Sequence, residues 1–86
     1  MLHPSLASGR WFTLTLMEQL GNIGSEIGRA GRWKDKDPVI FNATVDRALE
    51  LFDLTLDDPR WIGRRFEIAR MREVFCDAVF GGRAYQ

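Results

Sequence analysis

Four glycines recur within one predicted helix, and they constrain the fold of this 86-residue chain more than any other feature. Their spacing of three, four and three residues places them within roughly a quarter of the helix circumference. Each glycine costs about 0.8–1 kcal/mol relative to alanine, which is large beside the about 5–15 kcal/mol stability of a small domain. We therefore predict that another backbone lies close to this face, either within the chain or in a second copy, unless the segment kinks or breaks. The four residues are Gly21, Gly24, Gly28 and Gly31.

Apolar residues repeat with helical spacing in three segments, and no useful stretch shows the alternation of a strand. We expect helices at about 14–33, 38–57 and 59–80, an irregular segment at 1–12 and a short tail at 81–86. The length suits a single domain over the whole chain. The sequence thus predicts an all-α fold, a three-helix antiparallel bundle that is completed as a helical-bundle dimer.

Capping residues support these helix starts. Thr15 and Glu18 match a capping box, in which each side chain satisfies a free backbone amide of the first turn. The Asp–Pro pairs at 37–38 and 58–59 are typical of a cap followed by a first helical residue. The third helix therefore starts directly after the second, which predicts an antiparallel hairpin.

The third predicted helix is apolar on two sides. A helix of this kind needs partners on both faces, and the first two helices can cover only one. We predict that a second subunit covers the other. One stripe comprises Ile62, Phe66, Ala69, Cys76 and Phe80; the other, taken as the candidate interface or packing set together with the glycines, comprises Trp61, Ile68, Met71, Phe75 and Val79.

Composition excludes several kinds of site. Twelve basic and twelve acidic residues cancel, whereas a nucleic-acid binder usually carries a basic excess. The single cysteine, Cys76, excludes an internal disulfide framework and is expected to be a small buried residue; it suits a reducing compartment. The only histidine is His3. We predict no metal and no cofactor, no signal peptide and no membrane span, and a cytoplasmic protein.

A mixed polar stripe on the first helix is the candidate partner-binding surface. It flanks the glycines, and Glu26 is expected to pair with an arginine of the third helix. A structural network or acid–base catalysis are the other interpretations, but catalysis needs a second group with a shifted pKa, and none is identifiable. The stripe comprises Glu18, Asn22, Ser25, Glu26 and Arg29.

Two further patterns have an ordinary and a functional interpretation. A row of four carboxylates on the second helix could bind a cation or a basic partner, but it points away from the core stripe and is typical of a solvated face. Arg–Trp pairs at 10–11, 32–33 and 60–61 could stack on nucleic acid, or the tryptophans could close the ends of the core. The carboxylates are Asp46, Glu50, Asp53 and Asp57.

Three stretches of the chain resemble a family of small bacterial all-helical proteins. They are EQLGNIGSEIGRAGRWK (18–34), RALELFDLTLDDPRW (47–61) and EIARMREVFCD (67–77), about half the chain. The resemblance implies an intact natural domain and no particular activity. A looser similarity to helical HEPN-type proteins implies a nucleotide-associated role, but the Arg…His motif of the catalytic members is missing here.

From these features we predict a non-enzymatic protein-binding or assembly module, built as a homodimeric helical bundle. The alternative function is a non-catalytic helper associated with nucleic acid or nucleotides, acting through Arg60, Arg64, Arg65 and the Arg–Trp pairs. Co-purification with nucleic acid would distinguish the two, because binding to phosphates is strongly salt-dependent.

Overall fold

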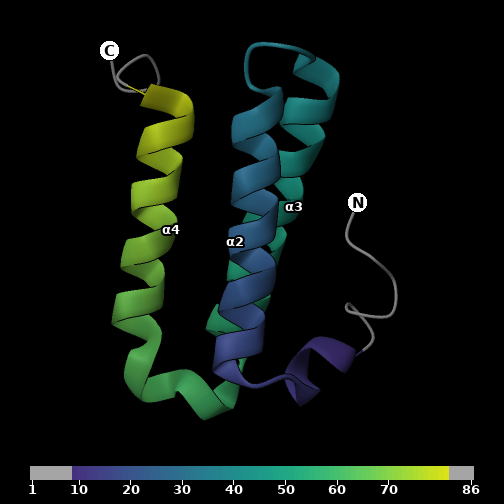
Figure 1. The fold of residues 1–86 in the computed structure, drawn as a ribbon. Coiled ribbons are helices and arrows are strands. Elements are labelled where there is room, and N and C mark those ends of the chain that lie inside the picture. Colours follow the sequence, from purple (N-terminus) through teal and green to yellow (C-terminus); the bar gives the residue numbers. More distant parts are fainter. Residues whose placement is uncertain (1–8, 82–86) are drawn as a thin grey trace.

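Three long helices account for most of residues 9–81, the part of the chain that the computed structural model describes. They are α2 (Leu16–Trp33), α3 (Pro38–Asp57) and α4 (Arg65–Phe80), preceded by the 3₁₀ turn η1 (Arg10–Thr13) and joined at the α3–α4 corner by η2 (Pro59–Arg64). Successive helices run in opposite directions, and α3 lies behind α2 (Figure 1). The fold is all-α, as predicted, and none of the helices within 9–81 is long and apolar enough to cross a membrane.

The predicted caps of the first two helices are confirmed. The Thr15 hydroxyl accepts from the Glu18 amide at 3.1 Å, and the Glu18 carboxylate accepts from the Thr15 amide at 2.8 Å. The Asp37 carboxylate accepts from the amides of Val39 and Ile40 at 3.0 and 3.2 Å, with Pro38 at the first helical position. These contacts satisfy amides that have no partner within the helix.

The core forms where α2 and α4 pack on α3. Apolar side chains recur on one side of each helix, as the heptad-like spacing predicts. Phe52 and Phe75 meet across the α3–α4 contact with ring centroids 6.0 Å apart. The buried apolar residues are Trp11, Ile23, Ala30, Val45, Ala48, Leu51, Phe52, Ile68 and Phe75.

The structure corrects the predicted ends of two segments. The third helix begins at Arg65 instead of residue 59, because 59–64 form a 3₁₀ turn whose backbone leaves helical geometry at Trp61 (φ −107°, ψ 22°). The segment predicted to be irregular contains η1, and Trp11 within it is completely buried. Residues 1–8 and 82–86, which hold His3 and most of the predicted tail, lie outside the described part.

Close packing of the four glycines within the chain is contradicted. Within residues 9–81, a Cβ added at Gly21, Gly24 or Gly31 would have no neighbour within 4 Å, and one at Gly28 would meet only the Arg32 guanidinium at 3.8 Å. The helix is continuous through all four, so the alternative of a break is wrong too.

This open face gives the first test. Gly21→Ala should raise the free energy of unfolding by about 1 kcal/mol, because alanine is the better helix former and nothing obstructs its methyl group. Urea denaturation at low protein concentration measures the change. Gly9→Ala is the control, since φ is +116° there and an L side chain is strained. A loss of stability in Gly21→Ala would contradict the open face.

Candidate functional site

An apolar groove lies between α2 and α4. Its volume is about 500 Å³. Phe52 of α3 forms its floor, while Leu20, Ile27, Met71 and Val74 stand on its walls. A smaller hollow of about 140 Å³ continues it towards Lys34 and shares Ile27 with it. From Leu20 to Lys34 the groove therefore follows α2 for about 21 Å at 1.5 Å per residue, the length of a four-turn helix.

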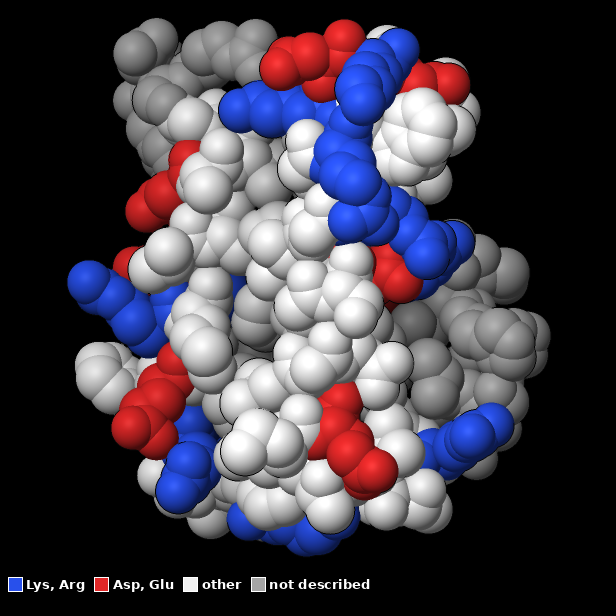
Figure 2. All heavy atoms as spheres, in the orientation of Figure 1, with Lys and Arg blue, Asp and Glu red and all other residues white. Residues whose placement is uncertain are grey.

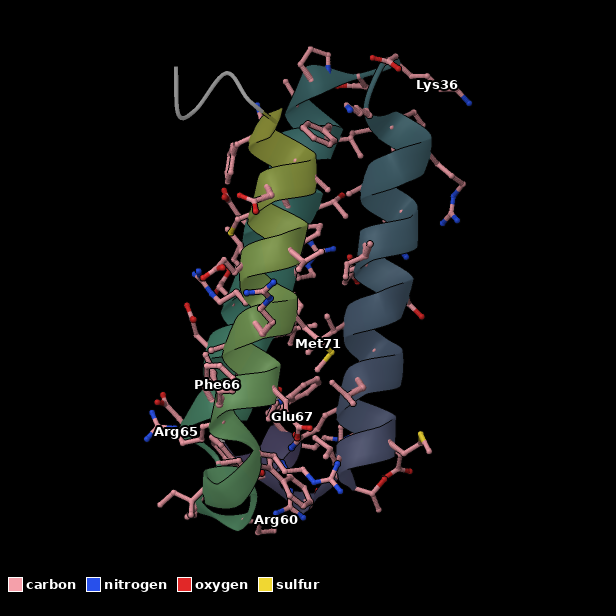
Figure 3. The ribbon with its side chains drawn as sticks, turned by 90° about the vertical axis from the view of Figure 1, so that its left-hand side faces the viewer. Lys36, Arg60, Arg65, Phe66, Glu67 and Met71 are labelled. Atoms are coloured by element: carbon pink, nitrogen blue, oxygen red, sulfur yellow. The ribbon has the colours of Figure 1, made fainter. Side chains whose placement is uncertain are left out.

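The groove exists because α4 packs mainly on α3 and stays apart from α2. Met71 points from α4 towards α2, whereas Arg65 and Phe66 point to the other side of α4 (Figure 3). Gly24 and Gly31 line the α2 wall. Without side chains there, this wall is low and the groove is open to solvent.

Apart from Arg70, the side chains that line the larger part of the groove are uncharged, and most charged side chains lie around it (Figure 2). Along α2 the first turn carries Glu18 and the last turns carry Arg29 and Arg32. Along α4 there is no such order: the first turn carries both Arg65 and Glu67, and Arg70 is the charged residue of α4 that lines the groove. The helices α2 and α4 run in the same direction (Figure 1), and only α2 has an acidic start and a basic end.

The packing set predicted on the third helix divides between the core and the groove. Ile68 and Phe75 are buried, Trp61 and Val79 are half-buried, and Met71 is 41% exposed. The opposite stripe is mostly exposed in the described structure, with Phe66 83% and Ile62 69% exposed. Cys76, predicted to be buried, is half-buried beside Arg72 (Nη1–Sγ 3.9 Å).

The polar stripe predicted to bind a partner is mostly engaged with its own helix. The Asn22 amide donates to the Glu18 carbonyl at 2.8 Å, and the Ser25 hydroxyl donates to the Gly21 carbonyl at 3.1 Å. Glu26 pairs with Arg47 of α3 at 3.5 Å, so its predicted pairing with the third helix is wrong. Arg29 is exposed.

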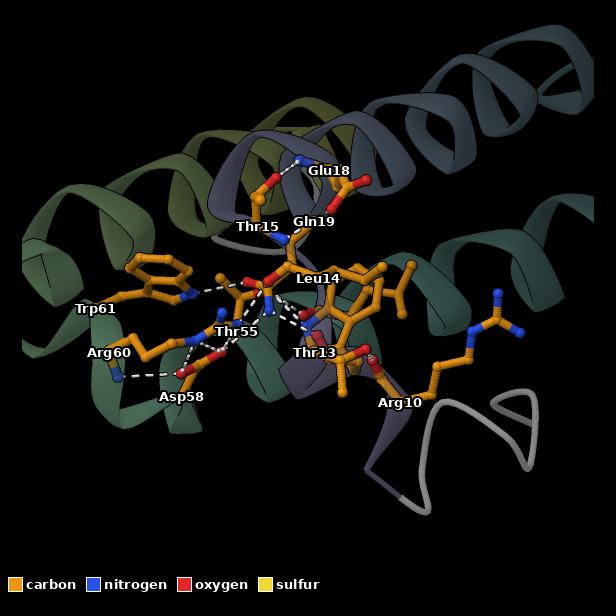
Figure 4. A network of polar contacts seen from close by, with 12 residues as sticks. Arg10, Thr13, Leu14, Thr15, Glu18, Gln19, Thr55, Asp58, Arg60 and Trp61 are labelled. Atoms are coloured by element: carbon orange, nitrogen blue, oxygen red, sulfur yellow. Dashed lines mark hydrogen bonds and ion pairs between the residues drawn. The ribbon is translucent and has the colours of Figure 1, made fainter.

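A buried polar cluster closes the end of the molecule where η1, α2 and η2 meet (Figure 4). The Gln19 amide donates to the Trp11 carbonyl at 2.9 Å and to Asp58 Oδ2 at 3.1 Å, and its oxygen accepts from Trp61 Nε1 at 2.8 Å. Trp11 Nε1 donates to the Thr55 hydroxyl at 3.1 Å. Every polar atom of the Gln19 amide thus has a partner, as burial requires.

Asp58 and Arg60 form the charged part of this cluster. Arg60 Nε and Nη2 donate to the Asp58 carboxylate at 3.0 and 2.7 Å, and the Arg60 amide donates to Oδ1 at 3.0 Å. These hydrogen bonds, with that of Gln19, hold the pKa of Asp58 at about 2, although burial opposes them. A carboxylate that remains ionised and fully hydrogen-bonded is typical of a structural ion pair and not of a proton donor.

Arg60 is therefore already used within the fold. Its Nη2 also donates to the Leu14 carbonyl at 2.6 Å, and its guanidinium lies 4.5 Å from the centre of the Trp61 ring. Arg60 and Trp61 therefore make a cation–π contact with each other. Arg64 and Arg65, the other arginines of the alternative prediction, are exposed.

Neither the acidic row of α3 nor any other cluster forms a metal site in the described part of the chain. Between residues 9 and 81, no three His, Cys, Asp or Glu side chains are placed to hold an ion. Asp46, Asp53 and Asp57 are exposed and Glu50 is half-buried. Asp53 contacts Arg72 of α4 at 3.0 Å, so one of the four contributes to the α3–α4 contact.

The groove was not predicted from the sequence, although its residues were. Leu20, Ile27 and Met71 carry the helical period of core residues. Only the separation of α2 from α4 leaves them beside an open space. No protein-family model matches the chain, and no similar curated protein or solved structure is found, so the groove and the polar cluster must be interpreted from their own geometry.

Proposed function

We propose that this protein is a non-enzymatic assembly module, and that a second copy of the chain fills the groove between α2 and α4 to give a homodimeric helical bundle. The groove itself carries the proposal. Its lining side chains are almost all apolar and stand open to water, and each Å² of apolar surface removed from water contributes about 25 cal/mol. Exposed apolar patches of this kind mark interaction sites.

Charge favours a second copy as the occupant. The chain has no net charge, so two copies do not repel one another as whole bodies. The helix α2 is acidic in its first turn (Glu18) and basic in its last (Arg32), so two copies of α2 that run in opposite directions bring opposite charges together. This face is therefore complementary to a copy of itself, and its length suits a helix of the size of α2 or α4.

Val74 provides a direct test because it stands on the α4 wall with 56% of its surface exposed. Val74→Glu should weaken dimerisation at least about tenfold, since a dimer would enclose the new carboxylate in an apolar space. The measurement is molar mass by size-exclusion chromatography with light scattering over a dilution series. The wild type should give twice the 9.9 kDa chain mass.

Val39→Glu is the matched control. Val39 is also exposed, at 77%, but it lies in the first turn of α3 and takes no part in the groove. It should leave the dimer unchanged, and circular dichroism should show that both variants are folded. A monomeric wild type at all concentrations, or equal effects of the two substitutions, would contradict the proposal.

A further inference from the structure

We infer that the second copy lies antiparallel on this face, with α2 of one copy against α2 of the other and the two-fold axis at the level of Glu26. This inference rests on the proposed dimer and specifies its geometry. It is argued from the open groove, from the order of charged residues along α2 and from the positions of the glycines in α2. It deepens the proposal because it names which residues of the two copies meet.

The charge order along α2 favours the antiparallel arrangement. Glu18, Ser25 and Arg32 follow one another at intervals of seven residues, all exposed, and so form a stripe along α2 beside the glycine face. A two-fold axis at Glu26 brings Glu18 of one copy to within two residues, about 3 Å along the helix, of Arg32 of the second copy. A parallel α2 pair would instead place like charges opposite one another.

The glycines of α2 are also arranged symmetrically about position 26. Gly21 and Gly31 lie five residues on either side of position 26, and Gly24 and Gly28 lie two residues on either side. An antiparallel copy centred there places every glycine opposite another glycine. Because the described structure leaves these positions uncovered, the two helix backbones can approach closely, and the helices can then cover the groove between them.

Glu18 and Arg32 allow a double-substitution test. Glu18→Gln should raise the dimer dissociation constant about threefold while keeping the capping box, because Gln is also favoured at that position. In an Arg32→Glu background the same change should lower the dissociation constant, because it removes a like-charge contact. Analytical ultracentrifugation measures all four proteins. An effect of Glu18→Gln with the same sign in both backgrounds would overturn the inference.

Cross-linking tests the direction independently. Two single-cysteine variants, Met17→Cys and Asp35→Cys, are made in a Cys76→Ser chain. Both positions are nine residues from position 26, and both native side chains are exposed. A short bis-maleimide should join the two variants when they are mixed, and should not join either to itself, since like positions would be about 27 Å apart. Joined like pairs would overturn the antiparallel arrangement. The wild type could form a dimer that Val74→Glu abolishes, but show neither the sign change nor the cross-link between unlike variants. That outcome would refute the antiparallel arrangement alone. A wild type that is monomeric at all concentrations would refute the proposed function as well.

Discussion

Asp58→Ala is expected to destabilise the fold by about 3 kcal/mol. Removing one partner of a buried ion pair costs about 3–5 kcal/mol, and the lower value applies because the Arg60 side chain is 39% exposed while that of Asp58 is 1% exposed. The substitution leaves Arg60 without its carboxylate and removes one acceptor from Gln19. It also removes the cap of η2. Against a total of about 5–15 kcal/mol, the variant should be only marginally folded.

Urea denaturation followed by circular dichroism measures this loss, with Asp57→Ala as the control. Asp57 is the preceding residue, and it is exposed, so its removal should change the free energy of unfolding by less than about 0.5 kcal/mol. Equal effects of the two substitutions would show that the polar cluster does not stabilise the fold.

The same carboxylate makes stability depend on pH. Its pKa is about 2 in the folded protein and 3.8 in the absence of the fold. A group with a lowered folded-state pKa contributes its full stabilisation above the unfolded value and loses it as the pH falls towards the folded value. The wild type should therefore lose this contribution between about pH 4 and pH 2. Melting temperatures of wild type and Asp58→Ala should converge over that range, and a constant difference would contradict the assignment.

Trp11→Ala should cost about 3–5 kcal/mol, the usual range for truncating a buried aromatic residue. Trp11 is completely buried, its indole donates to Thr55, and its carbonyl accepts from Gln19. The substitution therefore leaves a cavity and two polar groups with fewer partners. The free energy of unfolding from urea titration is again the measurement, and near-UV circular dichroism reports whether the end of the molecule stays ordered.

Trp33→Ala is the matched control for this substitution. Trp33 is only half-buried at the end of α2, so it should cost clearly less, about 1 kcal/mol. Equal losses of unfolding free energy in the two variants would contradict the prediction. They would show that Trp11 contributes no more to the core than a half-buried side chain does.

The helices were predictable because their signals are local. Thr15 with Glu18, and Asp37 with Pro38, act within one turn, so the sequence alone identifies them. The apolar residues of the helical period include Ile23, Val45 and Phe52, all of which are buried. By contrast, the start of the third helix was misplaced because Asp58 and Pro59 begin a 3₁₀ turn as readily as an α-helix.

The site depends on contacts between distant residues, which no local pattern encodes. Gln19 is polar and was not expected in the core, yet it is completely buried because Trp11, Asp58 and Trp61 satisfy its amide. The glycines were misassigned for the opposite reason. Their spacing shows that a close approach to α2 is possible, but not that any helix of the same chain makes it.

The polar cluster also has a consequence for how the chain folds. Trp11 and Thr55 are 44 residues apart in the sequence, and Arg60 and Leu14 are 46 apart, whereas α2 and α3 are joined by a turn of a few residues. Closing a long loop costs conformational entropy before its contacts form, and local contacts form faster than distant ones. We therefore expect the α2–α3 hairpin to form early in folding. The polar cluster is expected to form later, because it joins the segment before α2 to the segment after α3.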